Sequence, residues 1–250
     1  MRRALSFLLL LLLLAGCVRR PRITAPPANL PGTELLCPAG EEDMLRWFTP
    51  RDTSLHAEGN HNPLYTTVLG DRFYWTKSAK GWPWDIQLYD TRYIYLWITE
   101  NGWSSPASFK QFEGKNEPLA PRCLALKGGK DAVITVPDTR YRAFSSCSDY
   151  TVKSLRKGVN EVWGPYPMNW KALGRSAPTV VVSYRYNCGD DYDSCRDKEL
   201  YYLVKDYGLM QWQHHQLSAA PNDYKLVESS VFDRLRPGQT DPYFPCADKK

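Results

Sequence analysis

The sequence predicts a mainly β domain: an antiparallel sandwich or a strongly curved sheet, with one or two short helices and disulfide staples. Three observations support this fold class. Several segments rich in Val, Ile and Tyr alternate with a period of two, which is typical of strands. The chain has 19 Pro and 16 Gly residues, which suit the many turns of an antiparallel fold. Six cysteines follow residue 32, enough for three disulfide bonds.

The first half of the chain contains one predicted helix and two predicted strands. Residues 41–48 should form a short helix, because acidic residues begin the segment and its apolar residues fall on one side. Residues 73–77 and 93–100 should be strands. Both faces of 93–100 carry large apolar side chains, so this strand must be covered on both sides. One open sheet cannot provide that cover, which favours a sandwich or a strongly curved sheet.

The second half is richer in strand patterns. Residues 131–136 and 178–186 are predicted strands, and 150–157 is expected to be the second short helix. Residues 199–204 and 209–214 should pair as a hairpin. Gly208 closes the four-residue turn between them, where its freedom to take a positive φ permits a bulge.

The six cysteines fit a disulfide framework, as is usual for an exported protein. Two of them bracket a short polar loop, two bracket a pair of strands, and the last two lie near the ends of the domain. No Cys-x-x-Cys spacing is present, so a structural zinc site is the weaker alternative. The expected pairs are Cys188 with Cys195, Cys123 with Cys147, and Cys37 with Cys246.

The N-terminus has the pattern of an export signal. Arg2 and Arg3 precede an apolar run over residues 5–14, and the run leads into Leu14-Ala15-Gly16-Cys17. This resembles a bacterial lipoprotein signal peptide, in which the cysteine is lipidated and becomes the mature N-terminus. The resemblance implies that residues 1–16 are removed and that Cys17 anchors the protein to a membrane. A plain transmembrane anchor or an ordinary secretory signal is the alternative.

Residues 17–32 are expected to form a lipidated, Pro-rich tether, and residues 33–250 a single β-rich domain. The lipoprotein resemblance implies a place in the cell envelope. An Asp after the lipidated Cys typically retains such proteins in the inner membrane. Val18 stands there in this chain, which implies the outer membrane if the source is Gram-negative.

The charge distribution argues against nucleic acid as a partner. Of the 32 Lys and Arg residues, five lie before Ile23, which leaves 27 to balance the 27 Asp and Glu. No Lys or Arg run follows Arg22, so the domain lacks the basic stripe that nucleic acid binding needs. The basic residues beside Cys17 instead suit anionic lipid headgroups.

Aromatic residues are concentrated between residues 75 and 103, where five of the nine tryptophans lie. Trp82 and Trp84 flank a proline, and an indole on a proline-stiffened loop loses little entropy when it meets a ligand. Indoles stack on sugar rings, while nearby polar side chains bind the hydroxyl groups. The predicted ligand site comprises Trp82, Trp84, Asp85, Gln87 and Asp90.

Two alternatives to this site remain open. Tryptophans are common in β cores, and Trp75 and Trp97, which lie in predicted strands, are expected there. A glycosidase needs two carboxylates about 5 to 9 Å apart, for which Asp85, Asp90 and Glu100 are the first candidates.

Metal sites are a further possibility. The loop over 187–197 carries four carboxylates that could bind calcium, although it lacks the EF-hand spacing. His56 and His61 lie in a polar loop, whereas His214 and His215 should point to opposite faces of a strand and cannot share one metal. No other cofactor is expected. The candidate calcium ligands are Asp190, Asp191, Asp193 and Asp197.

The sequence therefore predicts an envelope-anchored, non-catalytic module that binds a glycan or another envelope component. No Gly-x-Ser-x-Gly, phosphate-binding or His-Glu-x-x-His motif points to an enzyme. A structural or assembly lipoprotein that binds a protein partner is the first alternative, and a glycan-active hydrolase is the second.

Overall fold

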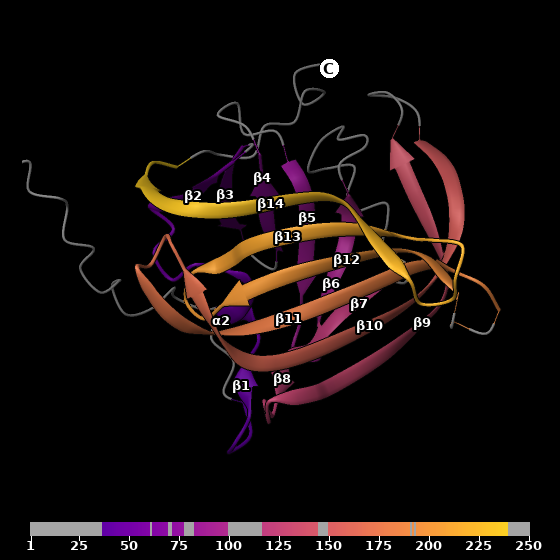
Figure 1. Ribbon diagram of the computed structural model, residues 1–250, viewed down its shortest axis with the longest axis horizontal. Coiled ribbons are helices and arrows are strands. Elements are labelled where there is room, and N and C mark those ends of the chain that lie inside the picture. The colour runs from indigo at the N-terminus through magenta and orange to yellow at the C-terminus, as the bar shows by residue number, and fades with distance from the viewer. Residues whose placement is uncertain are drawn as a thin grey trace, which may run out of the picture.

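The computed structural model describes residues 37–60, 62–69, 72–77, 83–99, 117–144, 150–190, 192 and 194–239. These residues are mostly strands, with one short helix among them (Figure 1). In chain order the elements are β1 (Glu42–Asp43), α2 (Leu45–Phe48), β2 (Leu55–Gly59), β3 (Pro63–Leu69), β4 (Arg72–Thr76), β5 (Pro83–Tyr89), β6 (Tyr93–Thr99), β7 (Glu117–Pro121), β8 (Cys123–Leu124), β9 (Gly129–Phe144), β10 (Tyr150–Trp170), β11 (Arg175–Cys188), β12 (Cys195–Val204), β13 (Gly208–Leu217) and β14 (Tyr224–Pro237).

Twelve strands form one antiparallel sheet in the order β7-β6-β5-β4-β3-β2-β14-β13-β12-β11-β10-β9, and β1 pairs with β8 separately. Neighbours in the large sheet are consecutive in the chain except for β2 and β14. The β9 end of the sheet approaches the β7 end, because the Asn160 amide of β10 donates a 2.7 Å hydrogen bond to the Pro118 carbonyl of β7. The sheet is therefore strongly curved and nearly closed, which confirms the predicted fold class.

The curvature gives the sheet an inner and an outer face. Figure 1 shows β9 to β14 as a front layer, with β4 to β7 running in a different direction behind it. Successive residues in a strand point to opposite faces, and residues paired across antiparallel strands share a face. The inner face can therefore be followed from strand to strand through the register.

The apolar core lies between α2 and the inner face. The Phe48 ring of α2 lies 6.0 Å from the Phe73 ring and 6.2 Å from the Trp75 ring of β4. Trp75 in turn lies 5.6 Å from the ring of Tyr201 in β12. All four side chains are buried, so the core joins α2 to both layers of the sheet. The expected core position of Trp75 is confirmed.

The short helix covers the end of the sheet at which β12 turns into β13. The backbone N–H of Asp206 in this turn donates a 2.7 Å hydrogen bond to the Arg46 carbonyl. The Arg46 guanidinium donates in return to both Asp206 carboxylate oxygens at 2.9 Å. We call this the α2 end of the sheet, and we call the opposite end, where β11 and β13 finish, the far end.

A disulfide between Cys37 and Cys123 fastens the segment before α2, and so does a buried ion pair between Asp43 and Arg122. Cys37 is bonded to Cys123, so the expected pairs Cys37 with Cys246 and Cys123 with Cys147 are wrong. The antiparallel pairing of β1 with β8 places Asp43 opposite Cys123 and brings the N-terminal segment to this cysteine. The expected Cys188–Cys195 bond is confirmed. Cys246 lies outside the described residues, as does Cys147.

The two predicted helices differ from the observed elements. In the segment 41–48 only Leu45–Phe48 is helical, because Glu42–Asp43 pairs as a strand with β8. The predicted helix over 150–157 is wrong, since this segment begins strand β10 and pairs with β9. Long-range pairing along the full length of β9 outweighs the weak local helix pattern there.

The predicted hairpin is confirmed. Strand β12 contains 199–204, and β13 contains 209–214. The turn has Asp206 at a φ of 67° and Gly208 at a φ of 76°. A register shift follows Tyr202, so the hairpin is irregular close to its turn as expected.

Candidate functional site

A polar cluster lies on the inner face beside the aromatic core. Strand β5 contributes Asp85 and Gln87, which are the register partners of Trp75 and Phe73 in β4. Because Phe73 and Trp75 pack against α2, their partners face inward as well. Both polar side chains are buried.

The opposite side of the cluster is centred on Glu199 of β12. The Glu199 carboxylate accepts hydrogen bonds from the Tyr201 hydroxyl at 2.9 Å and from the Trp212 indole N–H at 2.8 Å. The Tyr186 hydroxyl of β11 donates to it at 3.1 Å. Hydrogen bonds to an ionised acceptor are stronger than neutral ones, so three aromatic side chains are held in fixed positions.

The two sides of the cluster face each other. Burial raises the pKa of Tyr201 well above its usual 10.0, and the negative charges of Glu199 and Asp85 raise it further. The Trp75 ring, whose register partner on β5 is Asp85, lies 5.6 Å from the Tyr201 ring of β12, so the two sides are close across the interior. At neutral pH the Tyr201 hydroxyl therefore stays protonated and keeps its hydrogen bond to Glu199.

Gln87 is the least satisfied member of the cluster. Its side chain is 0% exposed, and neither its amide nitrogen nor its amide oxygen has a hydrogen-bond partner in the part of the chain that the structure describes. Each unmet polar group of this kind costs about 1 to 3 kcal/mol. Such groups are rare in folded proteins, and each requires an explanation. A bound hydroxyl group, which is both donor and acceptor, would satisfy the amide.

Further aromatic and polar side chains extend the cluster toward the far end. Asp197 accepts a 2.7 Å hydrogen bond from the Asn187 amide and lies 3.3 Å from Nε2 of His214. The His214 ring stacks on Trp212 at 6.3 Å between centroids, and the Lys77 ammonium lies 5.1 Å from the Trp212 centroid. Flat rings beside fixed hydrogen-bonding groups are typical of sites for polar ligands.

The structure brings together only part of the site predicted from the sequence. Asp85 and Gln87 lie side by side on the inner face of β5. Trp84 belongs to β5, whereas Trp82 lies outside the described residues. The contribution of the two tryptophans stays a prediction.

Asp90 lies away from Asp85 and Gln87, in the turn between β5 and β6. Its carboxylate accepts hydrogen bonds from the backbone N–H groups of Arg92 at 2.7 Å and Tyr93 at 2.9 Å, and from the Tyr95 hydroxyl at 2.9 Å. Partial burial raises its pKa, but these hydrogen bonds outweigh burial and hold the pKa below the usual 3.8. Asp90 therefore stabilises a turn.

The predicted calcium ligands have separate partners where they are described. Asp190 is exposed and accepts a 2.6 Å hydrogen bond from Lys157, which lowers its pKa. Asp197 faces inward and belongs to the polar cluster. Asp191 and Asp193 lie outside the described residues, and the described ones hold no group of three metal-ligating side chains. Calcium binding stays a prediction.

His214 and His215 follow the expected geometry, whereas the expectation that His56 lies in a polar loop is wrong, because His56 belongs to strand β2. His214 faces inward and His215 outward, as neighbours on β13 must. His56 of β2 is buried against the Tyr65 ring at 4.3 Å between centroids. Its Nδ1 lies 3.2 Å from the Gly238 carbonyl. His61 lies outside the described residues.

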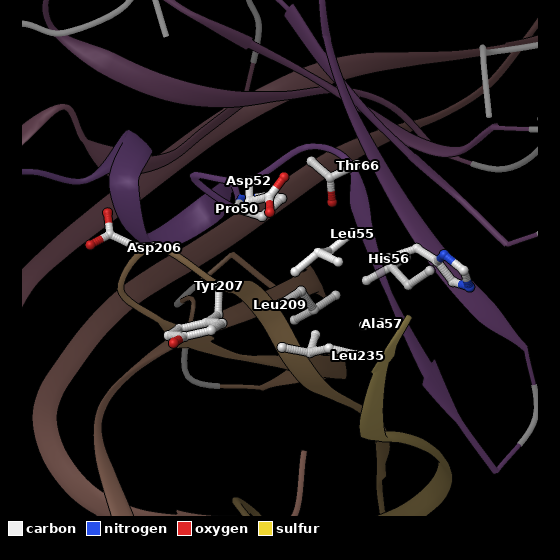
Figure 2. Close-up of a pocket in the computed structure, with 11 residues that line it drawn as sticks. Pro50, Asp52, Leu55, His56, Ala57, Thr66, Asp206, Tyr207, Leu209 and Leu235 are labelled. Carbon is white, nitrogen blue, oxygen red and sulfur yellow. The ribbon is translucent and has the colours of Figure 1, made fainter. Parts of the chain in front are cut away.

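A separate pocket opens near the α2 end, between β2, β3, β13 and β14. It encloses about 500 Å³, including the open solvent at its mouth. Figure 2 shows Leu55, Leu209 and Leu235 around its centre, with the Thr66 hydroxyl directed toward them and the His56 ring turned away. This lining suits a small apolar group and shares no residue with the polar cluster.

Sequence reasoning missed Glu199, Tyr186 and Trp212. One signal was available for Glu199, because alternation in the predicted strand places it on the same face as Tyr201 and Leu203. A carboxylate on an otherwise apolar face indicates a buried polar site. The other two join it only through the register of three neighbouring strands.

Comparison of the chain with protein-family models, with curated protein sequences and with solved structures found no match. Among the described residues, no helix is long and apolar enough to cross a membrane.

Proposed function

We propose that this chain is a lipid-anchored, non-catalytic binding protein of the cell envelope, whose ligand binds at the polar cluster on the inner face. The observation that carries the proposal is Gln87, with both amide atoms buried and without partners among the described residues. It lies beside the buried carboxylate of Asp85, and the Trp75 partner of Asp85 lies 5.6 Å from Tyr201, whose hydroxyl is held by Glu199.

A hydroxyl-rich ligand such as a glycan suits this chemistry. Sugar hydroxyls both donate and accept, which matches an amide next to a carboxylate. The stacked rings of Tyr184 and Tyr186, with centroids 4.6 Å apart, add apolar surface next to the hydrogen-bonding groups. Trp82 and Trp84 are the sequence candidates for a stacking platform close to Asp85.

The sequence supports the envelope location. The lipobox ending at Cys17 supports lipid anchorage, and Val18 supports transport to an outer membrane. The Pro-rich segment 17–32 would hold the domain away from the membrane surface, where it could reach an envelope glycan.

An array of bacterial envelope glycans probed with the full chain in detergent tests the proposal. Gln87→Leu fills the same space without polar atoms, so it should leave the melting temperature unchanged or higher and weaken binding at least about tenfold. Gln211→Leu, on the outer face of β13, is the matched control and should bind as the wild type does. Wild-type affinity in Gln87→Leu would refute the assignment of the site.

The same assay separates binding from hydrolysis. If the chain is a hydrolase, incubation with a bound glycan releases new reducing ends, and Asp85 with Glu199 becomes the candidate carboxylate pair. If it is a binding module, the glycan is recovered intact.

A protein partner is the second candidate, because β14 exposes large apolar side chains. Leu226 and Val227 are 54% and 56% exposed. Exposed apolar groups of this kind occur at assembly surfaces. Two results together would favour this role. The wild type would bind no glycan but co-purify with an envelope protein, and Leu226→Ser would lose that protein.

A further inference from the structure

Three basic side chains form a row on the outer face of the sheet. Arg185 of β11 is the register partner of Lys198 in β12, and Lys198 is the partner of His215 in β13. Each residue follows or precedes an inward-facing residue of the polar cluster, so the row faces away from that site. We call these three residues the basic row.

The basic row is not an ordinary solvated surface. The Arg185 side chain is only 18% exposed, and Lys198 and His215 are partly buried. Like charges at directly opposite positions of a sheet destabilise it, and burial increases the repulsion. Placing an arginine beside a lysine here is therefore unfavourable unless a negative charge lies between them.

The described carboxylates supply too little negative charge. Glu161 lies 3.6 Å from the Arg185 guanidinium, but it is already bonded to Lys130 at 2.7 Å. Lys198 has no salt bridge among the described residues, and its ammonium lies 5.4 Å from the Tyr224 ring centroid. The row thus keeps an excess of positive charge.

Two nitrogen atoms of the row also lack partners. Nε of Arg185 and Nδ1 of His215 are buried, and neither has a hydrogen-bond partner in the part of the chain that the structure describes. Both can donate to an oxygen atom. Burial lowers the pKa of Lys198 most, and the charge of Arg185 lowers it further. The charge of Glu161 raises it, but by less. Burial, and then the charge of Lys198, lowers the pKa of His215.

We propose that the basic row is an oxyanion site that binds a phosphate group. A phosphate carries about −1.5 to −2 charges near neutral pH, which matches the charges of Arg185 and Lys198. Its several oxygens can accept from the arginine fork, the ammonium and the imidazole together. The phosphate could be a free phosphate ester or a lipid headgroup. The site lies on the opposite face from the polar cluster, so it does not depend on the proposed glycan function.

Thermal unfolding of the full chain in neutral detergent tests the site, with inorganic phosphate replacing chloride at constant ionic strength. Phosphate should raise the wild-type melting temperature by about 5 to 10 °C at 100 times its Kd. Lys198→Met removes the repulsion with Arg185, so it should melt at or above the wild-type temperature without phosphate and should lose the response to phosphate.

Lys171→Met is the matched control. Lys171 is exposed and pairs with Asp233 away from the row, so this variant loses the same charge but should keep the response. A wild type that shows no phosphate-specific rise, or a Lys198→Met variant that responds like the wild type, would overturn the proposal.

A second titration identifies the source of the phosphate. Dihexanoyl phosphatidic acid, kept below its micellar concentration, presents the same group on a lipid. If it stabilises the wild type at lower concentration than inorganic phosphate and has no effect on Lys198→Met, the site binds lipid headgroups. If inorganic phosphate acts at lower concentration, the site binds a free phosphate. If Lys198→Met responds to inorganic phosphate and to dihexanoyl phosphatidic acid as strongly as the wild type does, the site is again refuted.

Discussion

Replacing Arg122 with Met should be among the most destabilising single changes in the described part of the domain. The Arg122 and Asp43 side chains are 4% and 7% exposed, and their ion pair includes a 2.8 Å hydrogen bond from Nη2. The same guanidinium donates to the Asp90 carbonyl at 3.2 Å and lies 5.0 Å from the Tyr89 ring centroid. Removing one partner of a buried pair leaves the other charge in a poorly solvated place, which costs about 3 to 5 kcal/mol.

Urea unfolding of the full chain, with its disulfides oxidised, measures this loss. Arg46→Met is the matched control, because Arg46 pairs with Asp206 at the same end of the sheet but is 39% exposed. Exposed pairs contribute about 0 to 1 kcal/mol, so this variant should lose far less stability. The double change Asp43→Asn with Arg122→Met should recover part of the loss, since no charge stays buried. Equal losses in Arg122→Met and Arg46→Met would refute the reasoning.

The remaining predictions concern three other features. Non-reducing peptide mapping should recover Cys37 linked to Cys123, and a peptide that links Cys37 to any other cysteine contradicts the structure. Closing the 86-residue separation of Cys37 and Cys123 should contribute about 4 to 5 kcal/mol in urea unfolding, so a double Ser variant that unfolds at the wild-type midpoint refutes this. The raised pKa of Tyr201 means that stability is fully present below the unfolded value of 10.0 and falls as the pH rises through the higher folded value. Urea midpoints between about pH 9 and about pH 11 should therefore drop less in Tyr201→Phe than in the wild type. Cys17→Ser should move the protein from the membrane to the soluble fraction, and membrane retention of that variant contradicts the lipobox.

Local patterns in the sequence were sufficient for the fold class and for several strands. The β12 and β13 hairpin was predictable because alternation, a polar turn and Gly208 all agree. The pattern of 93–100 required cover on both faces, and the curved sheet supplies an inner face there for Ile94 and Leu96. Such features depend on neighbours in the sequence, where alternation is directly visible.

Features that depend on distant segments were not predictable in this way. The partner of Cys37 follows from the pairing of β1 with β8, which joins residues about 80 positions apart and leaves no local signal. The segment 150–157 resembled a helix when it was considered alone, but β9 provides a strand partner along its length. The polar cluster combines residues from β5, β11, β12 and β13, so only Asp85 and Gln87 could be selected from one stretch of sequence.

The basic row lies on β11, β12 and β13, back to back with the part of the polar cluster on those strands, and this arrangement has a testable consequence. Tyr186 and Glu199 face inward, while their neighbours Arg185 and Lys198 face outward. Substitutions at distant sites without shared partners usually add within about 0.3 to 0.5 kcal/mol, whereas contacting residues do not. Gln87→Leu lies on a strand of the other layer, so its effect on stability should add to that of Lys198→Met. Their ligand responses should also stay separate, since each change removes a group from only one face. A double variant whose loss of phosphate response depends on Gln87 would show that the sheet couples its two faces.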